Sequence, residues 1–177
     1  MGEQLYFAYG SNMNLDQMEF RCPDAEVAGN VRLEDYRLAF CGRGSGSGVA
    51  TILPEKGSHV DGVLWKITQK CERSLDLYEG YPRLYGKERI HVKDREGTVS
   101  EVMVYTMNAP YKDQPSSPSQ VYLDGILEGC RQNGIRIGNV REALKRTKAE
   151  EKVMKCTKAE ERAGKPISGN RKKYRER

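Results

Sequence analysis

The sequence predicts an α+β fold, a small and mostly antiparallel β-barrel or curved sheet with flanking helices and a basic C-terminal helical tail. Strand-favouring stretches form hairpins and the helical patterns are set to one side of them, which is typical of this class. A chain of 177 residues is also long enough for one domain with its own core and too short for two ordinary ones.

The first predicted strand ends in a glycine turn. Leu5 to Tyr9 favour a strand and run directly into Gly10-Ser11-Asn12. Because Gly10 has no Cβ, it tolerates φ > 0 and lets backbone N–H groups of the turn point at a ligand. A short helix over residues 14–20, capped by Asn14, would direct the positive end of its dipole toward the same ligand. The turn is therefore a candidate cradle for a carboxylate, although many loops use the same residues only to reverse the chain.

A long, interrupted strand is predicted over residues 25–40, after a turn at Pro23-Asp24. Residues 41–48 contain four glycines but lack the Lys-Ser/Thr of a phosphate-binding loop. We interpret them as a flexible loop, with a lid over the site as the alternative. Further strands are predicted over residues 49–53 and 60–67.

The next element is a helix that Thr68 can cap and that ends near Gly80. Glu79 then lies beside the negative pole of this helix, so its pKa should be raised if the site also buries it. Asp76 precedes Glu79 by three residues and shares nearly the same helical face. It could raise the pKa of Glu79 as a like charge, or it could cap a neighbouring loop.

A hairpin and a further helix complete the predicted body. Residues 85–93 and 98–107 form two strands, and the second carries Tyr105. Residues 108–119 contain three prolines and should be irregular, and an amphipathic helix follows over 120–132.

The basic character of the chain is concentrated in its last residues. Residues 141–177 carry fourteen Lys/Arg and six Asp/Glu, a net charge of +8, whereas the whole chain carries +5. Two Thr-x-x-Glu repeats, starting at Thr147 and Thr157, have the spacing of capping boxes and predict helix to about Ala163. We therefore divide the chain into a domain of residues 1–140 and a basic helical extension of residues 141–177. We expect the last residues of the extension, 171–177, to be disordered. The tail is interpreted as solvated, with docking on nucleic acid as the less favoured alternative.

Several classes of protein are excluded by composition. The five cysteines form no Cys-x-x-Cys pair, which favours free thiols in a reducing compartment, and with two histidines no zinc-ligand spacing occurs. We expect no metal and no cofactor. The N-terminus has no basic region followed by a long apolar run, and no segment is long and apolar enough to span a membrane. We expect a soluble, cytoplasmic protein.

Three short motifs in the same order resemble those of the γ-glutamylcyclotransferase family, whose members release 5-oxoproline from γ-glutamyl compounds. They are Tyr9-Gly10-Ser11-Asn12, the segment from Leu75 to Gly80, and Tyr105. The resemblance covers residues 4–137 and implies a compact β-barrel with flanking helices that can form a homodimer. Because the glutathione-specific branch usually has Leu where this chain has Asn12, the general or amine-directed branch is favoured.

The resemblance also implies roles for individual residues. It places the general acid/base on Glu79, and Tyr105 matches a substrate-contacting tyrosine of the family, although it could also be an inward-facing strand residue. The predicted substrate-binding residues are Tyr6, Phe7, Ala8, Tyr9, Gly10, Ser11, Asn12 and Tyr105. Tyr122 and Asp76 are weaker candidates. Ser11 is expected to bind substrate, since lactam closure needs no covalent intermediate.

Three functions remain open. The first is cyclisation of γ-glutamyl amino acids. The second is the same chemistry on a γ-glutamyl amine, such as an isopeptide to lysine or a γ-glutamyl protecting group, which acidic side chains in the leaving-group pocket would favour. The third is a non-catalytic binding module that docks through the basic tail.

Overall fold

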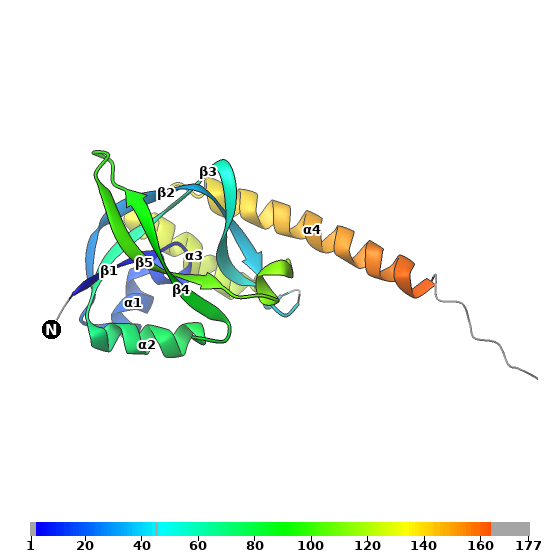
Figure 1. Cartoon of the computed structure of the whole chain (residues 1–177), viewed down its shortest axis with the longest axis horizontal. Helices are drawn as coiled ribbons and strands as arrows, with labels where there is room; N and C mark the ends of the chain where they lie inside the picture. The colour runs from blue at the N-terminus through cyan, green and yellow to red at the C-terminus, as the bar shows by residue number, and fades with distance from the viewer. Residues whose placement is uncertain (1–2, 45, 164–177) are drawn as a thin grey trace, which may run out of the picture.

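The computed structural model describes residues 3–44 and 46–163, which form a closed β-barrel with helices outside it (Figure 1). The strands are β1 (Gln4–Ala8), β2 (Glu26–Cys41), β3 (Val49–Ile67), β4 (Tyr85–Lys93) and β5 (Val99–Met107). Their order around the barrel is β1-β3-β2-β4-β5. Neighbouring strands are antiparallel except at the closure, where β1 runs parallel to β5 and Tyr6 pairs with Met103. The predicted α+β barrel is confirmed.

The helices are α1 (Leu15–Arg21), α2 (Gln69–Glu79), α3 (Gln120–Asn133) and α4 (Gly138–Ala163), with short 3₁₀ turns η1 (Ser11–Met13) and η2 (Tyr111–Asp113). The predicted caps Asn14 and Thr68 are confirmed, and Ser119 caps α3 in the same way. Asn14, Thr68 and Ser119 each accept a backbone N–H bond from three residues on. In the described part of the chain, no helix is long and apolar enough to cross a membrane.

The strand β3 is longer than predicted. Residues 49–53 and 60–67 belong to one strand of 19 residues, and in the polar stretch between them β2 pairs with Pro54 and His59 but with none of residues 55–58. Two register shifts bend this long pair, and the second lies at Asp35, whose φ is 60°. Asp35 Oδ1 accepts a bond from the N–H of Gly57, which has a φ of 83°. The bends let two long strands curve around the barrel.

The glycine-rich loop is packed against the segment before α3. The N–H of Gly42 donates to the carbonyl of Gln114 at 3.0 Å, and that of Gly48 donates to the carbonyl of Ser117 at 3.1 Å. A Cβ at Gly48 would lie 1.7 Å from the carbonyl oxygen of Ser116. Close backbone packing therefore explains this glycine and holds the ends of the loop in place, whereas its flexibility and its use as a lid stay predictions.

The helix α4 ends at Ala163, as predicted, but the two caps predicted within it are wrong. Val140, Ala143 and Thr147 are buried against the barrel, and Thr147 Oγ1 accepts a bond from the N–H of Phe40. Neither Thr147 nor Thr157 is an N-cap, because an N-cap residue lies outside the helix it begins. The predicted boundary after residue 140 falls inside α4, and the predicted disorder of residues 171–177 concerns residues outside the described ranges.

Candidate active site

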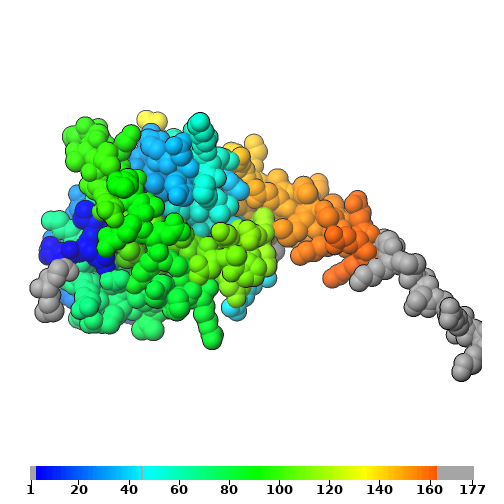
Figure 2. Space-filling model, in the orientation of Figure 1, coloured from blue at the N-terminus to red at the C-terminus, as the bar shows by residue number. Residues whose placement is uncertain are grey.

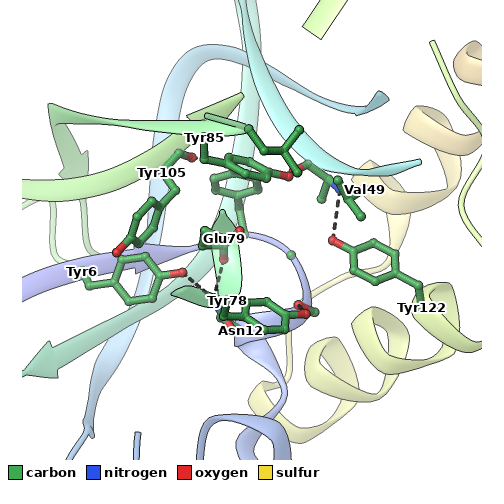
Figure 3. Close-up of a pocket in the computed structure, with 13 residues that line it drawn as sticks. Tyr6, Asn12, Val49, Tyr78, Glu79, Tyr85, Tyr105 and Tyr122 are labelled. Carbon is green, nitrogen blue, oxygen red and sulfur yellow. Dashed lines mark hydrogen bonds between the residues drawn. The ribbon is translucent and has the colours of Figure 1, made fainter. Parts of the chain in front are cut away.

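A small pocket of about 90 Å³ lies where η1, the end of α2, β4, β5 and α3 meet (Figure 3). Six of its lining residues are tyrosines, and one, Glu79, carries a carboxyl group. The lining residues are Tyr6, Tyr9, Gly10, Ser11, Asn12, Val49, Ala50, Tyr78, Glu79, Leu84, Tyr85, Tyr105 and Tyr122. Closure of the barrel brings two of these residues together. Because β1 and β5 are neighbours, the rings of Tyr6 and Tyr105 meet edge to face, with their centroids 5.8 Å apart.

The C-terminal cap of α2 positions Glu79. Gly80 has the left-handed conformation, with φ 67° and ψ 34°, and the N–H of Tyr81 donates to the carbonyl of Asp76 at 2.9 Å. This is the hydrogen bond of a Schellman motif, which ends a helix sharply. Glu79 is the last helical residue, and its carboxyl group points into the pocket beside Asn12 (Figure 3).

Burial raises the pKa of Glu79 to about 7, while the charge of Arg21 and the hydrogen bond from Asn12 act in the opposite direction. The predicted rise is present, burial is its largest cause, and Asp76 is not among the groups that shift it. The carboxylate of Asp76 is occupied elsewhere: it lies 2.8 Å from Lys87 Nζ and accepts a 2.6 Å bond from the Tyr105 hydroxyl. Its charge is therefore compensated by Lys87.

Asn12 connects the carboxyl group to the rest of the site. Its Oδ1 accepts a bond from the guanidinium of Arg21, and its Nδ2 donates to Glu79 Oε1 at 2.9 Å and to the Tyr6 hydroxyl at 2.8 Å. A guanidinium can only donate, so Arg21 fixes which end of the amide faces Glu79. The backbone carbonyl of Asn12 accepts a further bond from Trp65 Nε1 at 3.0 Å. The side chain is therefore held as a donor to Glu79.

The glycine turn has a different backbone from the one predicted. Gly10 has a φ of −125° and not a positive value. Space explains the glycine instead, because a Cβ there would lie 3.0 Å from the Cβ of Ala50. The turn continues as η1, and among the described residues no acceptor is bonded to the N–H of Ser11 or of Asn12. These two donors at the start of a helical turn are available to an anion.

Three of the pocket tyrosines use their hydroxyl protons within the protein. Tyr9 donates to the carbonyl of Tyr105 at 2.6 Å, Tyr85 donates to the carbonyl of Ala50, and Tyr105 donates to Asp76. Burial raises the pKa of all three phenols, so they remain protonated. These bonds fix the rings that form the walls of the pocket.

Two other tyrosines accept hydrogen bonds from the protein. Tyr6 accepts from Asn12, and the hydroxyl of Tyr122 accepts from the N–H of Ala50 at 3.0 Å (Figure 3). A hydroxyl that accepts one bond retains its own proton to donate. Tyr6 and Tyr122 can therefore offer O–H donors to a bound ligand.

The structure brings most of the predicted site residues together. Tyr6, Tyr9, Gly10, Ser11, Asn12, Glu79 and Tyr105 line the pocket, as does the weaker candidate Tyr122. Phe7 and Ala8 are corrections: both are buried in the core and neither lines the pocket. Side chains alternate across a strand, so Phe7 points to the opposite face from Tyr6.

Sequence reasoning missed the pocket residues Val49, Ala50, Tyr78, Leu84 and Tyr85. One compositional signal was present. The chain has ten tyrosines and three phenylalanines, and six of those tyrosines line this pocket. Such an excess indicates buried hydroxyl groups with a role beyond packing. In the described part of the chain, no group of three or more His, Cys, Asp or Glu side chains is arranged to hold a metal ion.

Comparison with known proteins agrees with this geometry. Residues 6–124 match the family model described as γ-glutamyl cyclotransferase, AIG2-like. This chain belongs to that family. The predicted resemblance is confirmed, and the match includes the glycine turn, Glu79 and Tyr105.

Curated relatives and solved structures lead to the same family. The human γ-glutamylcyclotransferase is 34% identical over 139 residues, which cover 74% of this chain and 72% of the relative, and the mouse protein is 35% identical over the same shares. A solved γ-glutamyl cyclotransferase structure superposes with a TM-score of 0.68 at 30% identity, covering 84% of this chain and 88% of the other. A mouse AIG2-like protein is 23% identical, with a TM-score of 0.54 over 67% of this chain and 88% of the other, and shows similarity of fold.

Proposed function

We propose that the protein cyclises γ-glutamyl amino acids, releasing 5-oxoproline and the free amino acid, with Glu79 as the general acid/base. One observation carries the proposal: among the described residues that line the pocket, Glu79 is the single charged group, and its pKa is about 7. A carboxyl group with such a pKa can accept and return a proton near neutral pH.

In the proposed reaction, the α-ammonium of the substrate first gives a proton to the carboxylate of Glu79. The resulting amine attacks the γ-carbonyl carbon, a C–N bond forms, and the carbonyl oxygen becomes an oxyanion. When the original amide C–N bond breaks, the oxyanion becomes a carbonyl again and Glu79 returns its proton to the departing nitrogen. The carboxylate of Glu79 then takes the second proton from the ring nitrogen, which leaves the neutral lactam, and passes it to the released amine. No group has to be transferred to the protein, so the main requirement is to hold the two reacting atoms together.

The remaining polar groups suit the γ-glutamyl head of the substrate. The free N–H groups of Ser11 and Asn12 can bind a carboxylate or the developing oxyanion, and the hydroxyls of Tyr6 and Tyr122 can donate beside them. The cavity of about 90 Å³ is smaller than the roughly 300–1,000 Å³ typical of sites that enclose a whole ligand. The head is therefore enclosed and the leaving amino acid lies at the rim.

The pocket favours an amino acid over a γ-glutamyl-ε-lysine isopeptide as the leaving group. A lysine leaving group would bring a second ammonium, and the described lining has no carboxylate other than Glu79 to receive it. Asp76, the next acidic side chain along α2, is already paired with Lys87. The relatives that are 34–35% identical are named γ-glutamylcyclotransferase, which supports the branch that acts on γ-glutamyl amino acids.

The test is incubation of the protein with γ-glutamyl-alanine, γ-glutamyl-ε-lysine and glutathione, with 5-oxoproline measured by mass spectrometry. We expect release from γ-glutamyl-alanine, loss of release in Glu79→Gln, and full release in the control Glu19→Gln, whose side chain is exposed on α1. Undiminished release by Glu79→Gln would overturn the assignment of the acid/base. Preference for γ-glutamyl-ε-lysine would instead place the protein in the amine-directed branch.

A further inference from the structure

One face of α4 carries a continuous row of positive charge. We call this row the basic stripe, and it comprises Arg141, Lys145, Lys148, Lys152, Lys155, Lys158 and Arg162. Successive members are three or four residues apart, so their side chains lie on the same face of the helix. All seven side chains are exposed.

The basic stripe is left unpaired, whereas acidic residues of α4 are used for contacts within the protein. Glu150 lies 3.3 Å from the guanidinium of Arg37, and Glu151 accepts bonds from the N–H and the hydroxyl of Ser117. Glu142 lies 3.9 Å from Arg146, which is itself paired with Glu55. Among the described residues, no hydrogen bond or ion pair involves the side chain of any stripe member.

Such an arrangement is unfavourable for the isolated protein. Positive side chains three and four residues apart on a helix repel one another, and ordinary solvated helices reduce this cost by placing acidic residues between them. Glu151 lies on that face between Lys148 and Lys155, but its two carboxylate oxygens accept hydrogen bonds from Ser117. A negatively charged partner that lies along the face would remove the repulsion.

The position of α4 leaves the stripe accessible. The first half of the helix packs on the barrel, and the second half projects beyond the body of the protein (Figures 1 and 2). From Arg141 to Arg162 the helix rises roughly 30 Å at about 1.5 Å per residue. The partner must therefore present negative charge along an extended line.

We propose that the basic stripe binds the phosphate backbone of double-stranded DNA. The part of α4 from residue 138 to 163 contains no aromatic residue, so it has no platform on which the bases of a single strand could stack. A membrane surface would require a wide apolar face with large side chains, and the projecting half offers only Val153, Met154 and Cys156. The major groove of B-form DNA admits an α-helix, whereas that of A-form RNA is too narrow.

The test is binding of the full chain to a fluorescein-labelled DNA duplex of arbitrary sequence, measured by anisotropy at increasing salt. The stripe variant combines Lys152→Glu, Lys155→Glu and Lys158→Glu in the projecting half, where a lysine-to-glutamate change preserves helix propensity. The matched control combines Lys56→Glu, Arg73→Glu and Lys112→Glu, three exposed sites on the body that give the same net charge. Helix content by circular dichroism should be equal in both.

We expect the stripe variant to bind at least tenfold more weakly and its plot of log K against log salt to lose about three units of slope, roughly one for each phosphate contact. The control should keep the slope of the wild-type chain. Equal weakening of both triple variants would show that net charge alone drives binding and would overturn the proposal. Preferred binding to duplex RNA, to a single strand or to vesicles of anionic lipid would overturn it as well.

Discussion

Replacing Glu79 with glutamine should lower activity and raise stability at the same time. Glutamine has the shape of glutamate and retains an oxygen that can accept the bond from Asn12, but it cannot take up or return a proton. We expect kcat to fall by about 10²–10⁴-fold, the usual contribution of a general acid/base. The stability effect has the opposite sign and follows from the raised pKa.

The size of the stability effect follows from linkage. The pKa of Glu79 rises from the ordinary value of 4.5 to about 7 in the folded protein, so the folded state binds more protons than the unfolded state between these values. The free energy of unfolding therefore decreases as pH rises through this window. The two pKa values differ by roughly 2.5, and at about 1.4 kcal/mol per pKa unit this difference gives a penalty of about 3.5 kcal/mol well above pH 7. Glutamine is neutral and avoids this penalty.

The assay is urea unfolding of the wild-type chain and of Glu79→Gln at pH 4, 6 and 8, with kcat measured on the same preparations. The difference in free energy of unfolding should be smallest at pH 4 and reach about 3 kcal/mol in favour of the variant at pH 8. A variant that is inactive and also less stable at pH 8 would refute the reasoning. A constant difference across the three pH values would show that Glu79 does not titrate in this window.

Three further predictions concern the groups around Glu79. Arg21→Leu removes a positive charge that lowers the pKa of Glu79, so the acidic limb of the pH profile of kcat/KM should move to higher pH, and a move to lower pH would contradict the assignment. Asn12→Asp replaces a donor to Glu79 with a negatively charged acceptor, so the limb should also move to higher pH, and an unchanged limb would show that this contact does not tune the carboxyl group. Gly10→Val should raise KM because its Cβ has no room, whereas Gly44→Val, which meets no atom within 4 Å, should leave KM unchanged; equal KM values in the two variants would refute the steric argument.

The fold was predictable to the extent that local patterns determine it. The caps of α1 and α2 were found because Asn14 and Thr68 satisfy helix N–H groups by local contacts. The length of β3 was not found, because its polar middle has no alternating apolar pattern and pairs with β2 only at Pro54 and His59. In the same way, Thr147 has the pattern of a cap but is buried within α4 by tertiary packing.

The site was predictable where a motif lies on one continuous segment. The glycine turn and the end of α2 are both local, and the structure places both in the pocket. Phe7 and Ala8 were wrongly included because the whole segment was assigned to the site, although alternation along β1 separates Phe7 from Tyr6. Arg21 could not be found, since its contact with Asn12 depends on how α1 folds back over η1.

The indirect contact between Arg21 and Glu79 explains how one carboxyl group can serve as both acid and base. Burial alone would push the pKa of Glu79 further upward, and the group would then remain protonated at neutral pH and could not accept a proton. A direct ion pair with an arginine would have the opposite result, because a paired carboxylate stays ionised and is a poor acid. Asn12 separates the two groups, accepting from Arg21 and donating to Glu79. The positive charge therefore partly offsets the effect of burial without neutralising the carboxylate, which leaves the pKa near the pH at which both proton transfers are possible.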